Sequence, residues 1–399
     1  MQCDSVSLNF KGAFFALFLE KYWEEEVMMK TVDGIYASAK IFTDQVEQYA
    51  IAQIQMLCDN EVSKGSTIRV MPDVHPGKVS TIGLTMTIRD MILPNLVGID
   101  IGCGMTIAPI KGKKIEYQKL DRIIREKVPA GSSLRKSIHR LSEEFDFKRL
   151  HCVNSVDVRR ELLGLGTLGG GNHFIEIDQD EKKQYYALVH SGSRHLGQCV
   201  TEYYLREGQK ILKEQGIQVP FELTYLTGDL MQEYLQDQLV VQEYAELNRR
   251  IILEELAKGM KWKWMNMTSC VHNYIDQKEE NCILRKGAIS AKLGETVVIP
   301  INMKEGILLG AGLGNKDWNE SAPHGSGRVY RRDEVQAHYT VSDYKAEMKG
   351  IYSSCIGKET LDEAPFAYRK TADIVENIQD TVVITAHLKP VYNYKAGGK

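Results

Sequence analysis

VGIDIGCGMT, residues 97–106, is an apolar run of the kind that fills a buried strand, yet it contains Asp100 and Cys103. Burying a carboxylate or a thiolate costs free energy unless a cation compensates the charge. In a straight strand, positions three apart point to opposite faces. We therefore expect Gly102 and Gly104 to introduce a bend or bulge that turns both donors toward one cation site.

Four further segments place a histidine beside glycines or a short turn. These are His173 in GGGNHFIE, His190 in LVHSGSRH, His272 in SCVHNYI and His324 in SAPHGSGR. Imidazole, thiolate and carboxylate together suit a borderline divalent cation such as zinc, manganese, iron or cobalt, and one cysteine can bridge two ions. Taken singly, each histidine is more often a hydrogen-bonded core residue, and Cys103 a small packed hydrophobe. The pattern indicates a metal site, but no local spacing rule identifies its ligands.

A glycine loop precedes one of these histidines. In GTLGGGNHFIEI, residues 166–177, the glycines allow close approach to a phosphate, and consecutive N–H groups can cradle it. The loop matches neither the P-loop nor the GxGxxG pattern. A tight turn leading into a strand explains it equally well.

Basic residues surround another of the histidines. SAPHGSGRVYRR, residues 321–332, places His324 just before Arg328 and Arg332, so its imidazole could accept a phosphoryl or nucleotidyl group while the arginines offset the charge. Arg194 and Lys286 lie in similar glycine-containing segments. These segments favour a polyanion groove in a slightly acidic protein, and the alternative is a solvated basic surface.

Hydrophobic periodicity predicts the main elements. We expect a helix over 43–60 capped by Thr43 and Asp44, a short strand and proline-marked turn over 66–78, a helix over 114–129, a helical pair or bent helix over 229–258 followed by Gly259, and two strands over 295–312. No repeat or linker separates the glycine-rich motifs, which favours a single domain whose loops converge on one site.

Composition is that of a soluble globular protein, with 399 residues, 43% of them hydrophobic, 26% charged, and a net charge of -3. The eight cysteines are scattered and no apolar run is long enough to span a membrane, so we expect a reduced cytoplasmic protein. Residues 1–27 are irregular and end in EEEV, which suggests a non-native extension ahead of a start at Met28 or Met29.

Nine motifs occur in the order found in the RtcB-type RNA ligases, from about residue 29 to the C-terminus. They are MPDVHPGK, NLVGIDIGCGM, GTLGGGNHFIEI, VHSGSR, VHN, RKGAIS, HGSGR, the AY of EAPFAYRK, and PVYNYK. Each motif alone is weak, but all nine in order make the chain resemble this family over most of its length.

The resemblance implies a GTP- and manganese-dependent RNA ligase, which joins a 3′-phosphate or 2′,3′-cyclic phosphate end to a 5′-hydroxyl end through a histidine–GMP intermediate in RNA repair or tRNA splicing. It implies an α+β fold in which one mixed domain, residues 28–399, places β-sheet layers around a central metal cleft. RNA is the expected partner, an archease-like activator is a candidate, and we expect a monomer with no membrane association.

Residue roles carry over motif by motif. The resemblance implies that His324 is the guanylylated nucleophile. The implied ligands of two manganese ions are Asp100, Cys103, His173, His190 and His272, with Cys103 as the bridge. The implied GTP contacts are Asn172, Glu176, Asn302, Tyr368 and Lys395. The implied RNA-phosphate contacts are Arg194, Lys286, Arg328 and Arg332. Asp73 and His75 of MPDVH are expected near the metals.

The chain also departs from the usual family pattern. HGSGR replaces HGAGR, and Ser326 could donate a hydrogen bond to phosphate. The turn PGSMGT reads PINMKE over 300–305, with Asn302 and Lys304 at altered positions, which puts strict GTP preference in question. The chain also continues past Lys395 as AGGK. These differences indicate a divergent paralogue branch.

Two other functions remain open from the sequence. A metal-dependent phosphoesterase or cyclic phosphodiesterase would use the same donors to activate water. A nonenzymatic RNA-binding protein would need neither the metal ligands nor His324. Because all of these groups are present, the ligase is the leading hypothesis.

Overall fold

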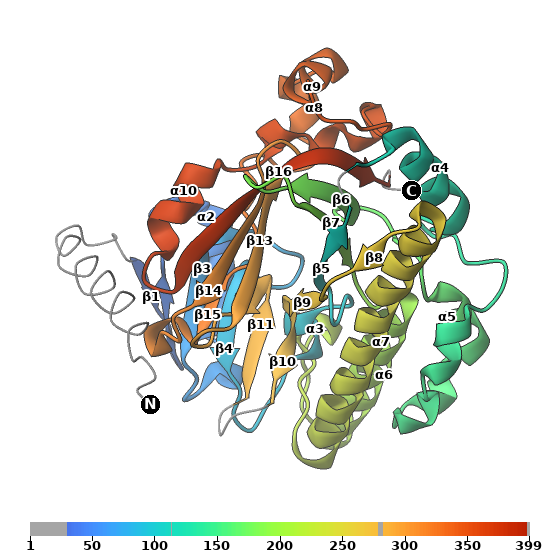
Figure 1. The fold of residues 1–399 in the computed structure, drawn as a ribbon. Helices are drawn as coiled ribbons and strands as arrows, with labels where there is room; N and C mark the ends of the chain where they lie inside the picture. Colours follow the sequence, from blue (N-terminus) through green and yellow to red (C-terminus); the bar gives the residue numbers. More distant parts are fainter. Residues whose placement is uncertain (1–29, 113, 278–281, 397–399) are drawn as a thin grey trace, which may run out of the picture.

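The computed structural model describes residues 30–112, 114–277 and 282–396, and the strands of this part form three sheets (Figure 1). The first sheet has six strands in the order β1 (Lys30–Asp33), β2 (Ser38–Ile41), β3 (Ile68–His75), β4 (Ile82–Thr87), β11 (Ile283–Lys286) and β10 (Asn273–Asp276). Only the β2–β3 pair within it is parallel.

The second sheet has eight strands and carries most of the candidate site. Their order is β13 (Thr296–Asn302), β14 (Gly306–Gly312), β16 (Val382–Lys395), β6 (Phe174–Gln179), β7 (Tyr185–Ser191), β5 (Gly104–Lys111) and β8 (Lys263–Trp264), and β9 (Thr268–Val271) also pairs with β5. The third sheet is the pair β12 (Ala288–Ser290) and β15 (Ser321–Pro323). The predicted α+β class is confirmed at this level.

The helices of the described part are mostly short. They are α2 (Gln48–Cys58), α3 (Pro94–Val97), α4 (Tyr117–Lys127), α5 (Val158–Gly164), α6 (Arg194–Glu214), α7 (Gly228–Met260), α8 (Val335–His338), α9 (Val341–Glu347) and α10 (Thr371–Val375). The two long helices, α6 and α7, lie side by side (Figure 1), and α7 packs against β5 and β7. None of the described helices is both long enough and apolar enough to cross a bilayer.

Helix α7 joins two apolar cores. Its buried Tyr244 belongs to the core under the six-stranded sheet, whereas Leu253 and Leu256 belong to the core between α4 and the eight-stranded sheet. A helix that faces two cores is apolar on more than one side, and for this reason its pattern suggested two helices or a bend. The structure has one helix of 33 residues.

Gly259 does not end α7, as the sequence had suggested. A Cβ at Gly259 would lie 2.6 Å from Cδ1 of Ile123 on α4, so glycine is needed there for the close approach of two helices. The helix ends at Met260, and Lys261 takes the left-handed conformation with φ 59°.

Two other element boundaries differ from the prediction. Helix α2 begins at Gln48 because the Thr43 hydroxyl accepts the N–H of Gln45 and forms a turn instead of a helix cap. Strand β3 runs through Pro72 to His75, with a shift of register against β4 after Val70. The predicted helix at 114–129 and the hairpin at 295–312 are confirmed as α4 and β13–β14.

The prediction of reduced thiols agrees with the described part, whose seven cysteines form no disulfide. The proposed non-native extension at 1–27 and the start at Met28 or Met29 lie outside the described residues.

Candidate metal centre and nucleotide pocket

Sheet pairing brings the distant donors together. Strands β6, β7, β5 and β9 are neighbours, and His190 on β7 lies opposite Met105 of β5 and Phe174 of β6. His173 immediately precedes β6, and His272 immediately follows β9. Side chains that are far apart in sequence therefore meet at one end of the central strands of the eight-stranded sheet.

Asp100 and Cys103 reach this end from a turn that precedes β5. Gly102 has φ +75°, and the Cys103 N–H donates to the Asp100 carbonyl at 3.2 Å. The predicted bend at Gly102 is confirmed, but neither donor lies inside the strand and no bulge is needed. A Cβ on Gly104 would lie 2.5 Å from the Cys270 carbonyl, so that glycine allows β5 and β9 to pair closely.

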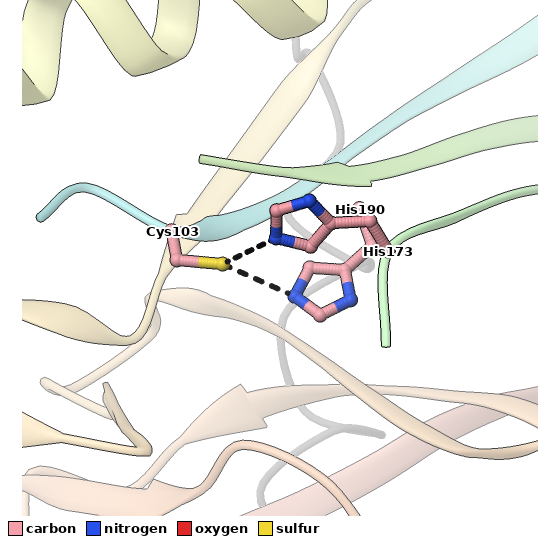
Figure 2. A group of neighbouring side chains, drawn as sticks. All are labelled: Cys103, His173 and His190. Atoms are coloured by element: carbon pink, nitrogen blue, oxygen red, sulfur yellow. Dashed lines mark hydrogen bonds between the residues drawn. The ribbon is translucent and has the colours of Figure 1, made fainter. Parts of the chain in front are cut away.

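The cysteine lies at the middle of a chain of contacts. Figure 2 shows the Cys103 thiol facing both His173 and His190, with 3.4 Å from Sγ to Nε2 of each ring. On one side, Nε2 of His173 is 3.1 Å from Oδ2 of Asp100. On the other, Nε2 of His190 is 3.3 Å from Nε2 of His272. The sequence-predicted set of five donors is thus one contiguous cluster, hereafter the metal cluster.

Backbone carbonyls fix the tautomers of two histidines. Nδ1 of His173 donates to the Leu168 carbonyl at 2.9 Å, and Nδ1 of His190 donates to the Asn172 carbonyl at 3.2 Å. A carbonyl can only accept, so Nδ1 carries a proton in both rings, and Nε2 of each ring faces Cys103. Such outer hydrogen bonds are typical of imidazoles that bind metals.

The donor set fits a divalent cation. Burial lowers the pKa of His190 and His272 well below the ordinary value and so keeps both rings neutral. Burial also raises the pKa of the Cys103 thiol, and the Asp100 carboxylate raises it further. A cation would compensate a thiolate and a carboxylate at this place, and cysteine with histidine selects a borderline ion.

His324 lies next to the metal cluster, at the end of β15. Its ring centroid is 4.8 Å from that of His272. Its Nδ1 donates to Oδ2 of Asp73 at 2.7 Å, and the same oxygen accepts the backbone N–H groups of His324 and Gly325, each at 3.2 Å. The fully buried Asp73 therefore orients the ring through Nδ1 and leaves Nε2 free of this bond. His75 also lines this region, and its Nδ1 donates to the Asp73 carbonyl at 3.0 Å.

A pocket with a cavity volume of about 120 Å³, partly open to solvent, begins at His324. All five residues that the resemblance assigns to GTP line it, as do His190, Arg328 and Arg332. Burial raises the pKa of Glu176, inside the pocket, to about 7. The structure therefore brings together the predicted nucleophile, part of the metal cluster and the predicted nucleotide contacts.

Glu363 organises the far end of the pocket and was not identified from the sequence. Its buried carboxylate pairs with Lys395 and Arg332, accepts the Tyr368 hydroxyl at 2.5 Å, and lies 3.3 Å from Arg328 Nη1. Burial opposes its charge, but the three cations lower the pKa of Glu363 to about 2. The sequence feature that could have identified Glu363 is its position at the start of EAPFAYRK, the motif whose AY matches the family.

The four predicted RNA-phosphate contacts are not one exposed patch. Arg328 donates to the Tyr330 and Asp362 carbonyls in addition to Glu363, whereas the Arg332 side chain remains 47% exposed. Arg194 donates to Thr167 Oγ1 and the Gly131 carbonyl, beneath the glycine loop. Lys286 is buried against the carbonyls of Asn95 and Val97. Arg194 and Lys286 are absent from the pocket lining.

The residues that depart from the usual family motifs have local partners. Oδ1 of Asn302 accepts the N–H groups of Lys304 and Glu305 and so closes the β13–β14 turn. Lys304 pairs with Glu347 of α9. The Ser326 hydroxyl donates to the Ile301 carbonyl at 2.8 Å and is buried, which contradicts the expectation that it is available to phosphate.

Two buried polar residues of α7 support the site from behind. Arg249 donates to the carbonyls of Gly102 and Ser191 at 2.8 and 2.9 Å. Asn248 accepts the N–H of Gly166 at 2.7 Å and donates to the Thr167 carbonyl at 3.1 Å. These bonds satisfy loop groups that would otherwise be buried without partners. The sequence feature that could have identified these two residues is the polar pair Asn248–Arg249 in LNRRII, inside an otherwise apolar part of the helix.

The fold and the site define an α+β protein with a buried cysteine–histidine cluster beside a pocket lined by His324, Lys395 and two arginines. Comparison with known families gives the particular group: the family described as tRNA-splicing ligase RtcB matches residues 60–396. The chain therefore belongs to the RtcB family.

Individual relatives agree with this assignment. The chain is 29% identical to the RNA-splicing ligase RtcB of Escherichia coli (strain K12) over 370 residues, which cover 81% of this chain and 88% of the relative. It is 28% identical to the tRNA-splicing ligase RtcB of Nanoarchaeum equitans (strain Kin4-M), with 94% and 98% covered. It is 25% identical to RtcB2 of E. coli (strain ATCC 25922), with 82% and 88% covered.

Proposed function

We propose that the protein is a GTP- and manganese-dependent RNA ligase, which joins RNA 3′-phosphate or 2′,3′-cyclic phosphate ends to 5′-hydroxyl ends in RNA repair or tRNA splicing. Membership of the RtcB family supports this proposal. The observation that carries it is the position of His324, which lies between the metal cluster and the pocket with Nδ1 bound to Asp73.

The first step is guanylylation of His324. The Nε2 lone pair attacks the α-phosphorus of GTP, the P–N bond forms, and the bond to the β-phosphate oxygen breaks so that pyrophosphate leaves. The Asp73 carboxylate keeps the proton on Nδ1 and stabilises the positive charge that develops on the ring. Asp73 therefore acts as a positioning residue for the nucleophile.

Two transfers complete the reaction. A 3′-phosphate oxygen of the RNA attacks the phosphorus of the histidine–GMP intermediate, and the P–N bond breaks, which restores the free imidazole. The 5′-hydroxyl then attacks the activated 3′-phosphate, loses its proton, and displaces GMP. A cyclic phosphate is first opened by water to the 3′-phosphate.

The metal cluster would hold two manganese ions, with Cys103 shared between them. Its members are Asp100, Cys103, His173, His190 and His272. The order of their contacts supports this assignment, because Cys103 separates the Asp100–His173 pair from the His190–His272 pair. Bound there, the ions would supply positive charge that polarises the phosphates.

The nucleotide would bind in the pocket through Asn172, Glu176, Asn302, Tyr368 and Lys395. Because Glu363 holds Tyr368 and Lys395, we assign it a positioning role at the guanine end. The Asn302 side chain caps its own turn, so base selectivity rests on the other residues and can be less strict than in relatives with the usual turn. We place the chain in a divergent branch of the family on this basis.

RNA phosphates would follow the open side of the pocket, where Arg332 is half-exposed. Arg328 lines the same pocket, and we propose that Arg194 and Lys286, which lie outside its lining, contact RNA phosphates beyond it. We further propose one catalytic domain with the metal cleft at its centre, monomeric and cytoplasmic. An archease-like protein is a candidate activator.

Incubation with α-labelled GTP and Mn²⁺ tests the proposal. We expect acid-labile label on the wild-type chain and none on His324→Ala. Label would be absent from a phosphoesterase, which would still open cyclic phosphates, and both activities would be absent from a protein that only binds RNA. Either of those results would replace the ligase assignment.

A further inference from the structure

A second group of metal-binding side chains lies between α5 and α6. Glu161 comes from α5, and His195 and Cys199 come from the first turns of α6. Nδ1 of His195 is 2.7 Å from Oε1 of Glu161 and 3.2 Å from Sγ of Cys199. One ligand atom of each residue lies within 4.8 Å of the other two. None of the three belongs to the metal cluster or lines the pocket.

The helix explains how two of these donors converge. His195 and Cys199 are four residues apart, so their side chains lie on the same face of α6, one turn from each other. Glu161 faces them from the neighbouring helix and is 1% exposed, which leaves its carboxylate little contact with water. The arrangement is therefore built by two packed helices and not by a surface loop.

A nucleophilic triad does not fit this geometry. In a Cys–His–Glu triad the thiol and the carboxylate bind opposite nitrogens of the imidazole, so that one receives a proton while the other holds the ring. Here Oε1 of Glu161 lies 2.7 Å from Nδ1, and Sγ of Cys199 is also closer to Nδ1, at 3.2 Å, than to Nε2, at 3.8 Å. One nitrogen cannot donate its proton to the carboxylate and accept the thiol proton at the same time.

A cation satisfies all three groups together. Carboxylate oxygen, imidazole nitrogen and thiolate sulfur form a ligand set that zinc accepts in tetrahedral sites. One carboxylate and one thiolate balance the charge of a divalent ion, and the thiol proton leaves to solvent when the ion binds. The His195 side chain is 38% exposed, so water can reach the remaining position.

We propose that Glu161, His195 and Cys199 form a second metal site that takes a zinc ion, with water as the fourth ligand. The ion ties α5 to the beginning of α6. This beginning contacts the metal cluster, because the Ser193 N–H donates to Oδ1 of Asp100 at 3.2 Å. The site stands independently of the proposed ligase activity, since it rests on other side chains.

Cobalt spectroscopy in a Cys103→Ala background tests the site. This background removes the central thiol of the metal cluster, so a thiolate-to-cobalt absorption band can only come from another cysteine. We expect one equivalent of Co²⁺ to produce the band, Cys199→Ala to abolish it, and the half-buried control Cys282→Ala to retain it. No band in the background chain, or a band that survives Cys199→Ala, overturns the proposal.

Thiol protection tests the same site in the otherwise unaltered chain. Cys199 is half-buried and open to alkylation by iodoacetamide, which peptide mass spectrometry can follow residue by residue. We expect Zn²⁺ to slow alkylation of Cys199 at least tenfold, and His195→Gln to remove this protection. Cys282 serves as the internal control and should react at the same rate throughout. Equal rates at Cys199 with and without Zn²⁺ overturn the proposal.

Discussion

Replacing Asp73 with asparagine isolates the hydrogen bond that orients His324. Oδ2 of Asp73 accepts three N–H groups, and the shortest of these bonds, 2.7 Å, comes from the imidazole. Asparagine retains the shape and one acceptor oxygen but loses the charge. A charge-assisted hydrogen bond contributes about 1.5–3 kcal/mol, which corresponds to a guanylylation rate about 10- to 150-fold lower.

The assay is single-turnover labelling with α-labelled GTP at saturating Mn²⁺, with metal content measured on the same samples. Asp237→Asn is a matched control, because that buried carboxylate also accepts two backbone N–H groups and one side-chain donor, from His151, Cys152 and Tyr204. We expect the control to lose stability but to label at the wild-type rate once folded.

Wild-type labelling by folded, metal-loaded Asp73→Asn would refute the assignment of Asp73 as the residue that orients the nucleophile. Slow labelling with reduced metal content would also count against it, because Asp73 bonds to His324 and Gly325 and not to the metal cluster. The expected result is a lower rate with unchanged metal content.

Four further predictions concern other parts of the chain. Cys103→Ala removes the centre of the metal cluster, so bound manganese and guanylylation should fall together, and elemental analysis showing full manganese would contradict the bridging role. Lys395→Ala leaves Glu363 with two cations, so GTP labelling should weaken and stability should drop by about 1–3 kcal/mol while metal content is unchanged. The pKa of Glu363 is lowered to about 2 in the folded protein. The ionised carboxylate therefore stabilises the fold fully above its ordinary pKa of about 4.5, and this contribution is lost as the pH falls toward 2. Urea unfolding should show that the unfolding free energy lost between pH 4.5 and 2 is about 3 kcal/mol smaller for Glu363→Gln than for the wild type. Lys261→Gly relieves a left-handed residue at the end of α7 and should raise stability by up to about 1 kcal/mol, which a lower melting temperature would disprove.

The local hydrophobic pattern correctly predicted helices and strands that bury one face against the core. Helix α4 and the β13–β14 hairpin follow from periodicity and turn residues alone. Local pattern failed where tertiary contacts decide the structure. The role of Gly259 depends on Ile123 of another helix, and strand β3 extends past Pro72 to His75 although its register with β4 is interrupted after Val70.

The site was predictable as a set of residues but not as a geometry. Motif order predicted the candidate donors, whereas their contacts come from sheet pairing between segments that are far apart along the chain. The bond between Asp73 and His324 joins residues 251 positions apart, so no sequence window contains both. The group at Glu161, His195 and Cys199 was missed for the same reason, because two helices must pack before it exists.

Asn172 contacts both the metal cluster and the pocket, so it can couple the ligands of these two sites without any direct contact between them. Its carbonyl holds Nδ1 of His190, while the residue itself lines the pocket. Any occupant that shifts this backbone alters how strongly His190 donates to a cation. Thermodynamic reciprocity then requires the cation to change the occupant's affinity by the same factor. For the proposed nucleotide and metal ion, the coupling is therefore one free energy, transmitted through the Asn172 peptide group and independent of the order in which the two bind.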